Sequence, residues 1–259
     1  VREALQKDES RRLLLESLET PEGRKTGFEL LGFVSKEEWP ILIDILIAEK
    51  RTTGLEGFLQ FLQKSNQKID EALLAFGVQR LVHLIPLLRS IDWEGRQAFI
   101  LRCLRSNQSQ VADAAIDFLS EIELPPDQAF SLFQKLSTAS KIKFLQIISE
   151  RNSEAWKSFA RLFLRSHSWK IYPDEISVPL LRFVILSLHD EALSALSPFI
   201  ESRRWGFFPL YPVERNLVLS VLANLRSPQL RTKLTPILSR EAGVFFQSRK
   251  LKERLRSAL

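Results

Sequence analysis

Apolar positions recur with a helical period along almost the whole chain. Within residues 57–76 they stand three and four residues apart, at Phe58, Phe61, Leu62, Ile69, Ala72, Leu73 and Phe76. Residues 110–122 likewise place one apolar face at Val111, Ala114, Ala115, Phe118 and Ile122. Such spacing is typical of amphipathic helices. Because no segment of comparable length alternates between apolar and polar residues, the pattern predicts an all-α protein.

Residues that favour helix N-termini are frequent. Ser35, with Glu38 three residues later, forms a capping-box pattern. Further N-cap candidates are Thr20 and Ser227, each followed by proline, and Asp92 and Ser153. Together with the apolar period, these signals predict helices near residues 2–18, 21–33, 36–49, 54–75, 77–89, 93–105, 110–122, 126–136, 139–150, 154–166, 174–188, 190–202, 213–225, 228–239 and 241–257. Short helices joined by such short links are expected to pack antiparallel.

A proline followed by two aliphatic residues recurs within helical patterns, at Pro40, Pro86, Pro179 and Pro236. Proline in the body of a helix costs about 3 kcal/mol, so we interpret the recurrence as a repeated unit. The first three prolines lie 46 and then 93 residues apart, close to one and two steps of a helical repeat. The fourth follows after 57 residues, so the register is not regular throughout.

Residues 20–46, TPEGRKTGFELLGFVSKEEWPILIDIL, carry the clearest repeat-like motif. The segment resembles the HEAT-repeat (armadillo-like) family of α-solenoids, running from the second helix of one unit into the first helix of the next. The matching residues are Arg24 at the basic position, Phe28, Leu30 and Leu31 on the apolar face, and Pro40 with Leu42 in the following helix. Residues 83–104 and 107–122 resemble the same motif more weakly.

The resemblance implies a right-handed α-solenoid of stacked antiparallel helix pairs. We therefore expect residues 1–259 to form a single α-helical repeat domain, with a basic C-terminal end at 201–259. Armadillo-like and unclassified helical stacks are the alternatives. A HEAT-like solenoid further implies a curved scaffold that binds other macromolecules.

Positive charge is concentrated at the end of the chain. Residues 201–259 carry 12 Lys and Arg against 4 Asp and Glu, whereas residues 1–200 carry 25 against 27. A basic end on a neutral body predicts an acidic protein, nucleic acid or an anionic membrane surface as its partner. A solvated terminal helix is the alternative.

Two connections, residues 165–175 and 201–212, are longer and less periodic than the others. Long loops between packed helices often carry binding residues, and Trp, Tyr and Arg dominate interface hot spots. The alternative is that their aromatic side chains cover the core between helix pairs. The candidate partner-binding residues in these connections are Trp169, Tyr172, Arg203, Arg204, Trp205, Phe208 and Tyr211.

The C-terminal segment 244–259 has a narrow apolar stripe that includes Leu251 and Leu255, surrounded by basic residues. Three interpretations compete. The segment is a terminal helix that covers the end of the stack, a docking helix for an acidic partner, or a contact for phosphates or anionic lipid. The candidate partner-binding residues here are Arg249, Lys250, Lys252 and Arg254.

No catalytic or metal-binding motif is present. The three histidines lack the spacing of a metal motif, and no phosphate-binding loop, dinucleotide fingerprint or serine elbow occurs. Cys103 is the only cysteine, which excludes an intrachain disulfide, and we expect it to be a small core residue. Acidic pairs such as Glu37-Glu38 fall in expected first helical turns, where carboxylates offset the helix dipole. The sequence therefore predicts neither an enzyme nor a cofactor.

We expect a non-enzymatic protein-binding scaffold or assembly component with one or more protein partners. The alternative is nucleic-acid binding through the basic C-terminal region. A subset of HEAT-like proteins are DNA glycosylases, which this chain resembles in size and basicity. That class has a catalytic aspartate with flanking tryptophans. In this chain, only Trp169 and Asp174 loosely resemble that arrangement.

No apolar run approaches the roughly 18–20 residues of a membrane span, and residues 1–12 lack the apolar core of a signal peptide. We therefore expect a soluble protein, with the cytoplasm favoured. The chain contains no methionine, and we expect the intact protein to extend upstream of Val1.

Overall fold

The computed structural model describes residues 8–65, 68–151, 153–204, 208–225, 228–243 and 249–258. In these ranges the chain is helical apart from turns and one pair of very short strands, which confirms the all-α prediction. The α-helices are α2 (Asp8–Glu19), α3 (Arg24–Gly32), α4 (Trp39–Ala48), α5 (Thr52–Lys64), α6 (Ile69–Ala75), α7 (Gly77–Leu84), α8 (Arg96–Leu104), α9 (Ser109–Ala115), α10 (Pro126–Lys135), α11 (Thr138–Ser149), α12 (Glu154–Ser166), α13 (Asp174–Leu188), α14 (Asp190–Glu201), α15 (Pro212–Ala223), α16 (Pro228–Ala242) and α17 (Arg249–Ser257).

Shorter elements join several of these helices. The 3-10 helices are η1 (Ile85–Ser90), η2 (Ile116–Ser120) and η3 (Ser168–Ile171). Strand β1 (Arg203–Arg204) pairs antiparallel with β2 (Phe208–Pro209), and Arg204 lies opposite Phe208.

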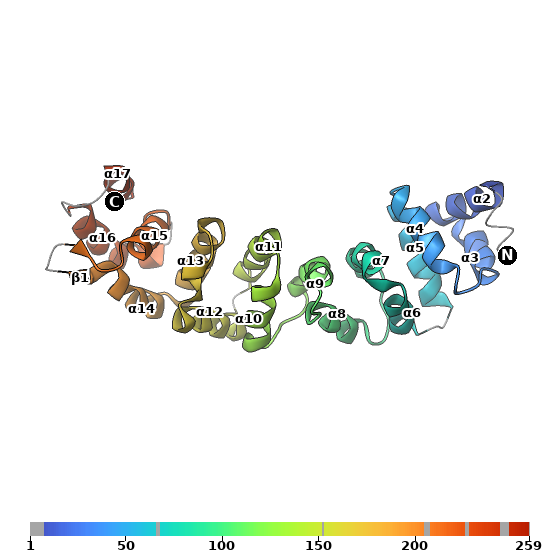
Figure 1. Cartoon of the computed structure of the whole chain (residues 1–259), viewed down its shortest axis with the longest axis horizontal. Coiled ribbons are helices and arrows are strands. Elements are labelled where there is room, and N and C mark those ends of the chain that lie inside the picture. The colour runs from blue at the N-terminus through green and yellow to red at the C-terminus, as the bar shows by residue number, and fades with distance from the viewer. Residues whose placement is uncertain are drawn as a thin grey trace. The chain divides into compact units, whose positions relative to one another are not determined.

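The helices form two compact units, residues 1–118 and residues 119–259. In the first unit, α5 packs against α2, α3 and α4, and α7 packs against α4, α6 and α9 (Figure 1). Aromatic rings fill part of its core, since the ring centroid of Trp39 lies 5.8 Å from those of both Phe58 and Phe61. The prediction of a single repeat domain over residues 1–259 stays a prediction.

The second unit is built in two layers. Helix α13 contacts α11 and α15, and α15 contacts α17, whereas α10 contacts α12 on the other side. Figure 1 shows α11, α13 and α15 along one side of this unit and α10, α12 and α14 along the other. The pairs α12–α13 and α14–α15 connect the two layers. Successive helices therefore alternate between the layers, as the short links between them require.

A cluster of aromatic side chains fills the space between these layers. The ring of Phe159 is fully buried, and its centroid lies 4.9 Å from that of Phe163, 5.3 Å from that of Phe144 and 6.0 Å from those of Phe133 and Trp156. Most of these pairs are edge-to-face, the arrangement that aromatic quadrupoles favour. The phenylalanine-rich composition of the chain thus supplies the core of the second unit.

Several predicted helices have different boundaries in the structure; those predicted at 77–89 and 110–122, for example, end as the 3-10 helices η1 and η2. The helix predicted at 54–75 consists of α5 and α6, because the Ser65 hydroxyl donates to the carbonyl of Leu62 where α5 ends. The helix predicted from 93 begins at Arg96, because Gly95 takes a left-handed φ of 95°. The helix predicted at 241–257 belongs to two elements, since α16 continues to Ala242 and α17 begins at Arg249.

The predicted N-caps have mixed outcomes. Ser153 is confirmed, since its hydroxyl accepts from the Trp156 amide at the start of α12. Ser35 instead begins a turn, and α4 starts later, at Trp39. Asp92 is not the N-cap of α8, because the intervening turn ends at the left-handed Gly95.

Only two of the four recurring prolines lie inside a helix. Pro179 lies within α13 and Pro236 within α16. Pro40 and Pro86 stand in the first turns of α4 and η1, where the missing amide hydrogen costs no helical hydrogen bond. The assignment of all four prolines to helix interiors is therefore wrong.

Candidate functional site

The two aromatic connections meet in the second unit. The ring of Phe199, near the end of α14, lies 5.4 Å from that of Trp169 in η3 and 5.2 Å from that of Tyr211, which precedes α15. The Lys170 ammonium group stands 4.2 Å from the Phe199 ring centroid and 5.5 Å from that of Tyr211, within cation–π range. It also lies 3.9 Å from a carboxylate oxygen of Glu214. Residues about 40 positions apart in sequence thus form one contact cluster.

Exposed apolar side chains surround this cluster. Ile171 is 77% exposed, Leu210 49% and Val213 75%. Ile171 follows Lys170 and Val213 precedes Glu214, so the ion pair between those two residues brings both exposed side chains to the same region. We call Ile171, Leu210 and Val213 the junction surface. Large exposed apolar side chains next to one cluster favour an interaction site.

The predicted aromatic residues themselves lie mostly in the core. Trp169 is buried. Tyr172 is half-buried, its ring lies 5.7 Å from that of Phe133, and burial raises the pKa of its hydroxyl. Tyr211 is partly exposed beside the junction surface. Trp205 lies outside the described residues, and the side chains of Arg204, Phe208 and Lys250 are likewise not described.

Arg203, another predicted partner-binding residue, belongs to a buried ion cluster. Its guanidinium group lies 3.0 Å from a carboxylate oxygen of Glu241, which is 1% exposed. Arg215, 2% exposed, also donates to Glu241, and Arg240 lies 3.3 Å from it. Arg240 pairs in addition with Glu201 at 2.9 Å. Three of the twelve basic residues after residue 200 therefore share two carboxylates inside the second unit.

Helix α17 packs on α15 and α16. Its Leu251 and Leu255 are buried, which places the predicted apolar stripe against the unit. Arg249 forms an exposed ion pair with Glu253 at 2.9 Å, and Arg254 is exposed. Lys252 is partly exposed. Of the three interpretations of this segment, the contacts favour a terminal helix that covers the end of the unit.

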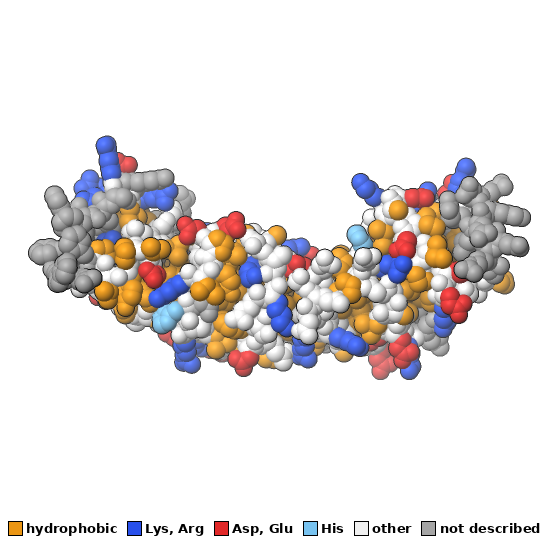
Figure 2. Space-filling view, viewed as in Figure 1, with side chains coloured by type: hydrophobic (Ala, Val, Ile, Leu, Met, Phe, Trp, Pro, Cys, Tyr) orange, Lys and Arg blue, Asp and Glu red, His pale blue; other side chains and the backbone are white. Residues whose placement is uncertain are grey.

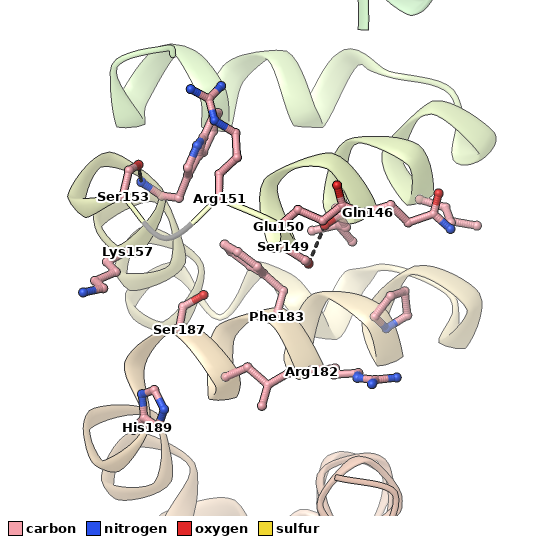
Figure 3. Close-up of a pocket in the computed structure, with 15 residues that line it drawn as sticks. Gln146, Ser149, Glu150, Arg151, Ser153, Lys157, Arg182, Phe183, Ser187 and His189 are labelled. Carbon is pink, nitrogen blue, oxygen red and sulfur yellow. Dashed lines mark hydrogen bonds between the residues drawn. The ribbon is translucent and has the colours of Figure 1, made fainter. Parts of the chain in front are cut away.

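A groove of about 610 Å³ lies between α11 and α13, with one end closed by α12. Figure 3 shows Phe183 in the middle of it, Lys157 and His189 towards one end, and Gln146 and Arg182 towards the other. We call this cavity the α11–α13 groove. The residues that line it are Ile142, Leu145, Gln146, Ser149, Glu150, Arg151, Ser153, Trp156, Lys157, Pro179, Arg182, Phe183, Leu186, Ser187 and His189.

Sequence reasoning missed this groove. Its two long walls come from helices separated by the whole of α12, so no local pattern brings them together. Over the visible face of the second unit, Lys and Arg side chains stand among Asp and Glu side chains (Figure 2). Two residues that the sequence analysis names, the N-cap candidate Ser153 and Pro179 of the recurring proline motif, lie on its wall.

Across the part of the chain that the structure describes, no three His, Cys, Asp or Glu side chains gather into a potential metal site. Cys103 is buried in α8, as the sequence predicts, and burial raises the pKa of its thiol to about 12.

We expect Cys103 to be unreactive towards a thiol reagent at neutral pH while the chain is folded. The thiolate is the reactive form, and a pKa near 12 leaves almost none of it. In denaturant the pKa returns to its ordinary value, and the same reagent should label the thiol readily. Absorbance at fixed reagent concentration measures both rates. Equal rates in buffer and in denaturant would contradict the burial of this residue.

The chain matches no protein-family model, no curated protein and no solved structure. Within the described ranges, every helix is too short or too polar to cross a lipid bilayer.

Proposed function

We propose that this chain is a non-enzymatic protein-binding scaffold that contacts its partner through the junction surface. The exposure of Ile171, Leu210 and Val213 carries the proposal. Exposed apolar side chains lose unfavourable contact with water when a partner covers them, at about 25 cal/mol per Å². The Lys170–Glu214 pair beside them offers polar contacts at the rim, as protein interfaces commonly have.

The proposed architecture is a right-handed, HEAT-like solenoid that extends through residues 1–259. Its support is the alternation of helices between two layers in the second unit, where α11, α13, α15 and α17 pack one on the next and α10 packs on α12. Repeat stacks have this nearest-neighbour pattern. The resemblance of residues 20–46 to a HEAT unit supports the same architecture.

Nucleic-acid binding through the C-terminal region is the second candidate. The exposed Arg254 and Arg256 on α17 favour it, because neither forms an ion pair with a described residue. Against it, Arg203, Arg215 and Arg240 are engaged by Glu241 and are less able to contact phosphates. The protein-binding proposal is therefore the stronger of the two.

Salt dependence separates the two candidates. The chain is used to capture partners from its native source, and protein and nucleic acid are quantified after washes at low and high salt. A scaffold with an apolar contact retains a discrete protein at high salt. Nucleic acid that elutes steeply with salt, with no protein retained, would overturn the proposal in favour of phosphate binding.

A further inference from the structure

The α11–α13 groove carries unbalanced positive charge. Lys157 and Arg182 line it towards its two ends, against the single carboxylate of Glu150. The guanidinium group of Arg151 points away from the groove and donates to the backbone carbonyl groups of Leu119 and Ile122 (Figure 3). Lys157 lies 4.0 Å from Glu154, at the limit of an ion pair. The groove therefore favours an anionic ligand.

Arg182 is the cation best placed to bind such a ligand. It is exposed on α13 and has no ion pair or hydrogen bond with any described residue. Val178 and Leu186 stand one helical turn before and after it, and both are partly exposed. An anion paired with Arg182 would therefore have apolar surface on either side.

We propose that the α11–α13 groove binds an acidic peptide segment of a protein partner, with an Asp or Glu carboxylate on Arg182 and an adjacent apolar side chain on Phe183 and Leu186. The ligand class rests on the proposed protein-binding function, but the surface is separate from the junction surface. The walls of the groove are partly exposed, as Gln146 and Ser149 show. A small molecule in so open a groove would stay half-solvated, whereas a peptide can extend beyond it, so the groove fits a peptide better. The apolar floor and Glu150 make phosphate-rich nucleic acid the poorer fit.

Selection of peptides tests the proposal. A phage-displayed library of random dodecapeptides is selected against the intact chain at physiological ionic strength. We expect enrichment of peptides that combine Asp or Glu with Leu, Ile or Phe. A synthetic copy of the most enriched peptide then gives dissociation constants by fluorescence anisotropy. Arg182→Glu should weaken binding by about tenfold or more, because it replaces attraction by repulsion.

Matched variants locate the site. Arg182→Lys keeps the charge and should bind nearly as well, whereas Leu186→Asp should bind about as poorly as Arg182→Glu. Arg165→Glu makes the same charge change at an exposed position of α12 outside the groove, and should bind like the unchanged protein. All these positions are exposed, and circular dichroism confirms that the variants fold.

Three results would overturn the proposal. They are no enrichment over the bare support, enriched peptides without acidic residues, and binding that Arg182→Glu leaves unchanged. Labelled oligothymidylate that binds the chain through Arg182, when no peptide does, would likewise overturn it. The Ile171→Glu/Val213→Glu variant should still bind the peptide. Loss of partner capture in that variant therefore concerns the junction surface, and loss of peptide binding in Arg182→Glu concerns the groove.

Discussion

Replacement of Glu241 by glutamine is expected to lower the free energy of unfolding of the second unit by about 3–5 kcal/mol. The carboxylate is 1% exposed and accepts from Arg215, which is equally buried, and from Arg203. Glutamine keeps the size of the side chain but removes its negative charge. The two guanidinium groups would then lose the Glu241 carboxylate, which offsets the cost of burying their charge.

Thermal unfolding followed by circular dichroism measures this loss. For a unit of this size, each kcal/mol corresponds to roughly 2–4 °C, so a fall of roughly 6–20 °C in the midpoint is expected. Glu201→Gln is the matched control, because its partner Arg240 is 2.9 Å away and both side chains are about half exposed. That change should cost less than about 1 kcal/mol. Equal shifts for the two variants would contradict the structural role of the buried cluster.

The helical periodicity of this chain predicts most of its helices. Most apolar residues at three-and-four spacing in residues 57–76 are buried in or next to α5 and α6, and Ser153 caps α12. Helix ends were less predictable. Helix α8 begins late because Gly95 has a left-handed φ, and α5 ends where the Ser65 side chain donates a hydrogen bond to the backbone. Neither feature is visible in the apolar pattern.

The candidate site was predictable only in outline. The unusual composition of residues 165–175 and 201–212 predicts a contact surface there, and the structure brings these two segments together through Phe199. However, Trp169 is buried, whereas Ile171, two residues later, is exposed. Sequence alone does not separate them, because exposure is decided by neighbours from α14 and α15. In the sequence, an isoleucine that will be exposed looks the same as one that will be buried in the core.

The buried ion cluster has a signal in the sequence that the net charge of residues 201–259 does not show. Glu241 is the only acidic residue between Glu214 and Glu253, in a stretch rich in Lys and Arg. A lone carboxylate among many cations is a natural centre for several ion pairs. Net charge over 201–259 instead indicated an exposed basic surface, because a sum over residues carries no information on which of them pair.

The junction surface should be essential for partner capture. In the Ile171→Glu/Val213→Glu variant, two carboxylates replace apolar side chains that are each about three-quarters exposed. The fold should not change, because neither side chain packs in the core. A partner that covers this surface would have to bury both charges, which costs far more than the apolar contact contributes. We expect the amount of captured partner to fall by about tenfold or more, since each 1.4 kcal/mol of lost binding is a factor of ten.

The matched control is Leu13→Glu/Ile41→Glu, which makes the same two changes at exposed apolar positions of the first unit. It keeps the net charge equal to that of the test variant, so a general effect of added negative charge appears in both. Partner capture by this control should equal that of the unchanged chain.

The most direct test of the protein-binding account is therefore quantitative affinity purification with these three proteins in parallel, washed at high salt. The account predicts one discrete protein retained by the unchanged chain and by Leu13→Glu/Ile41→Glu, and lost from Ile171→Glu/Val213→Glu. Equal retention by all three proteins would contradict the assignment of the interface to Ile171, Leu210 and Val213.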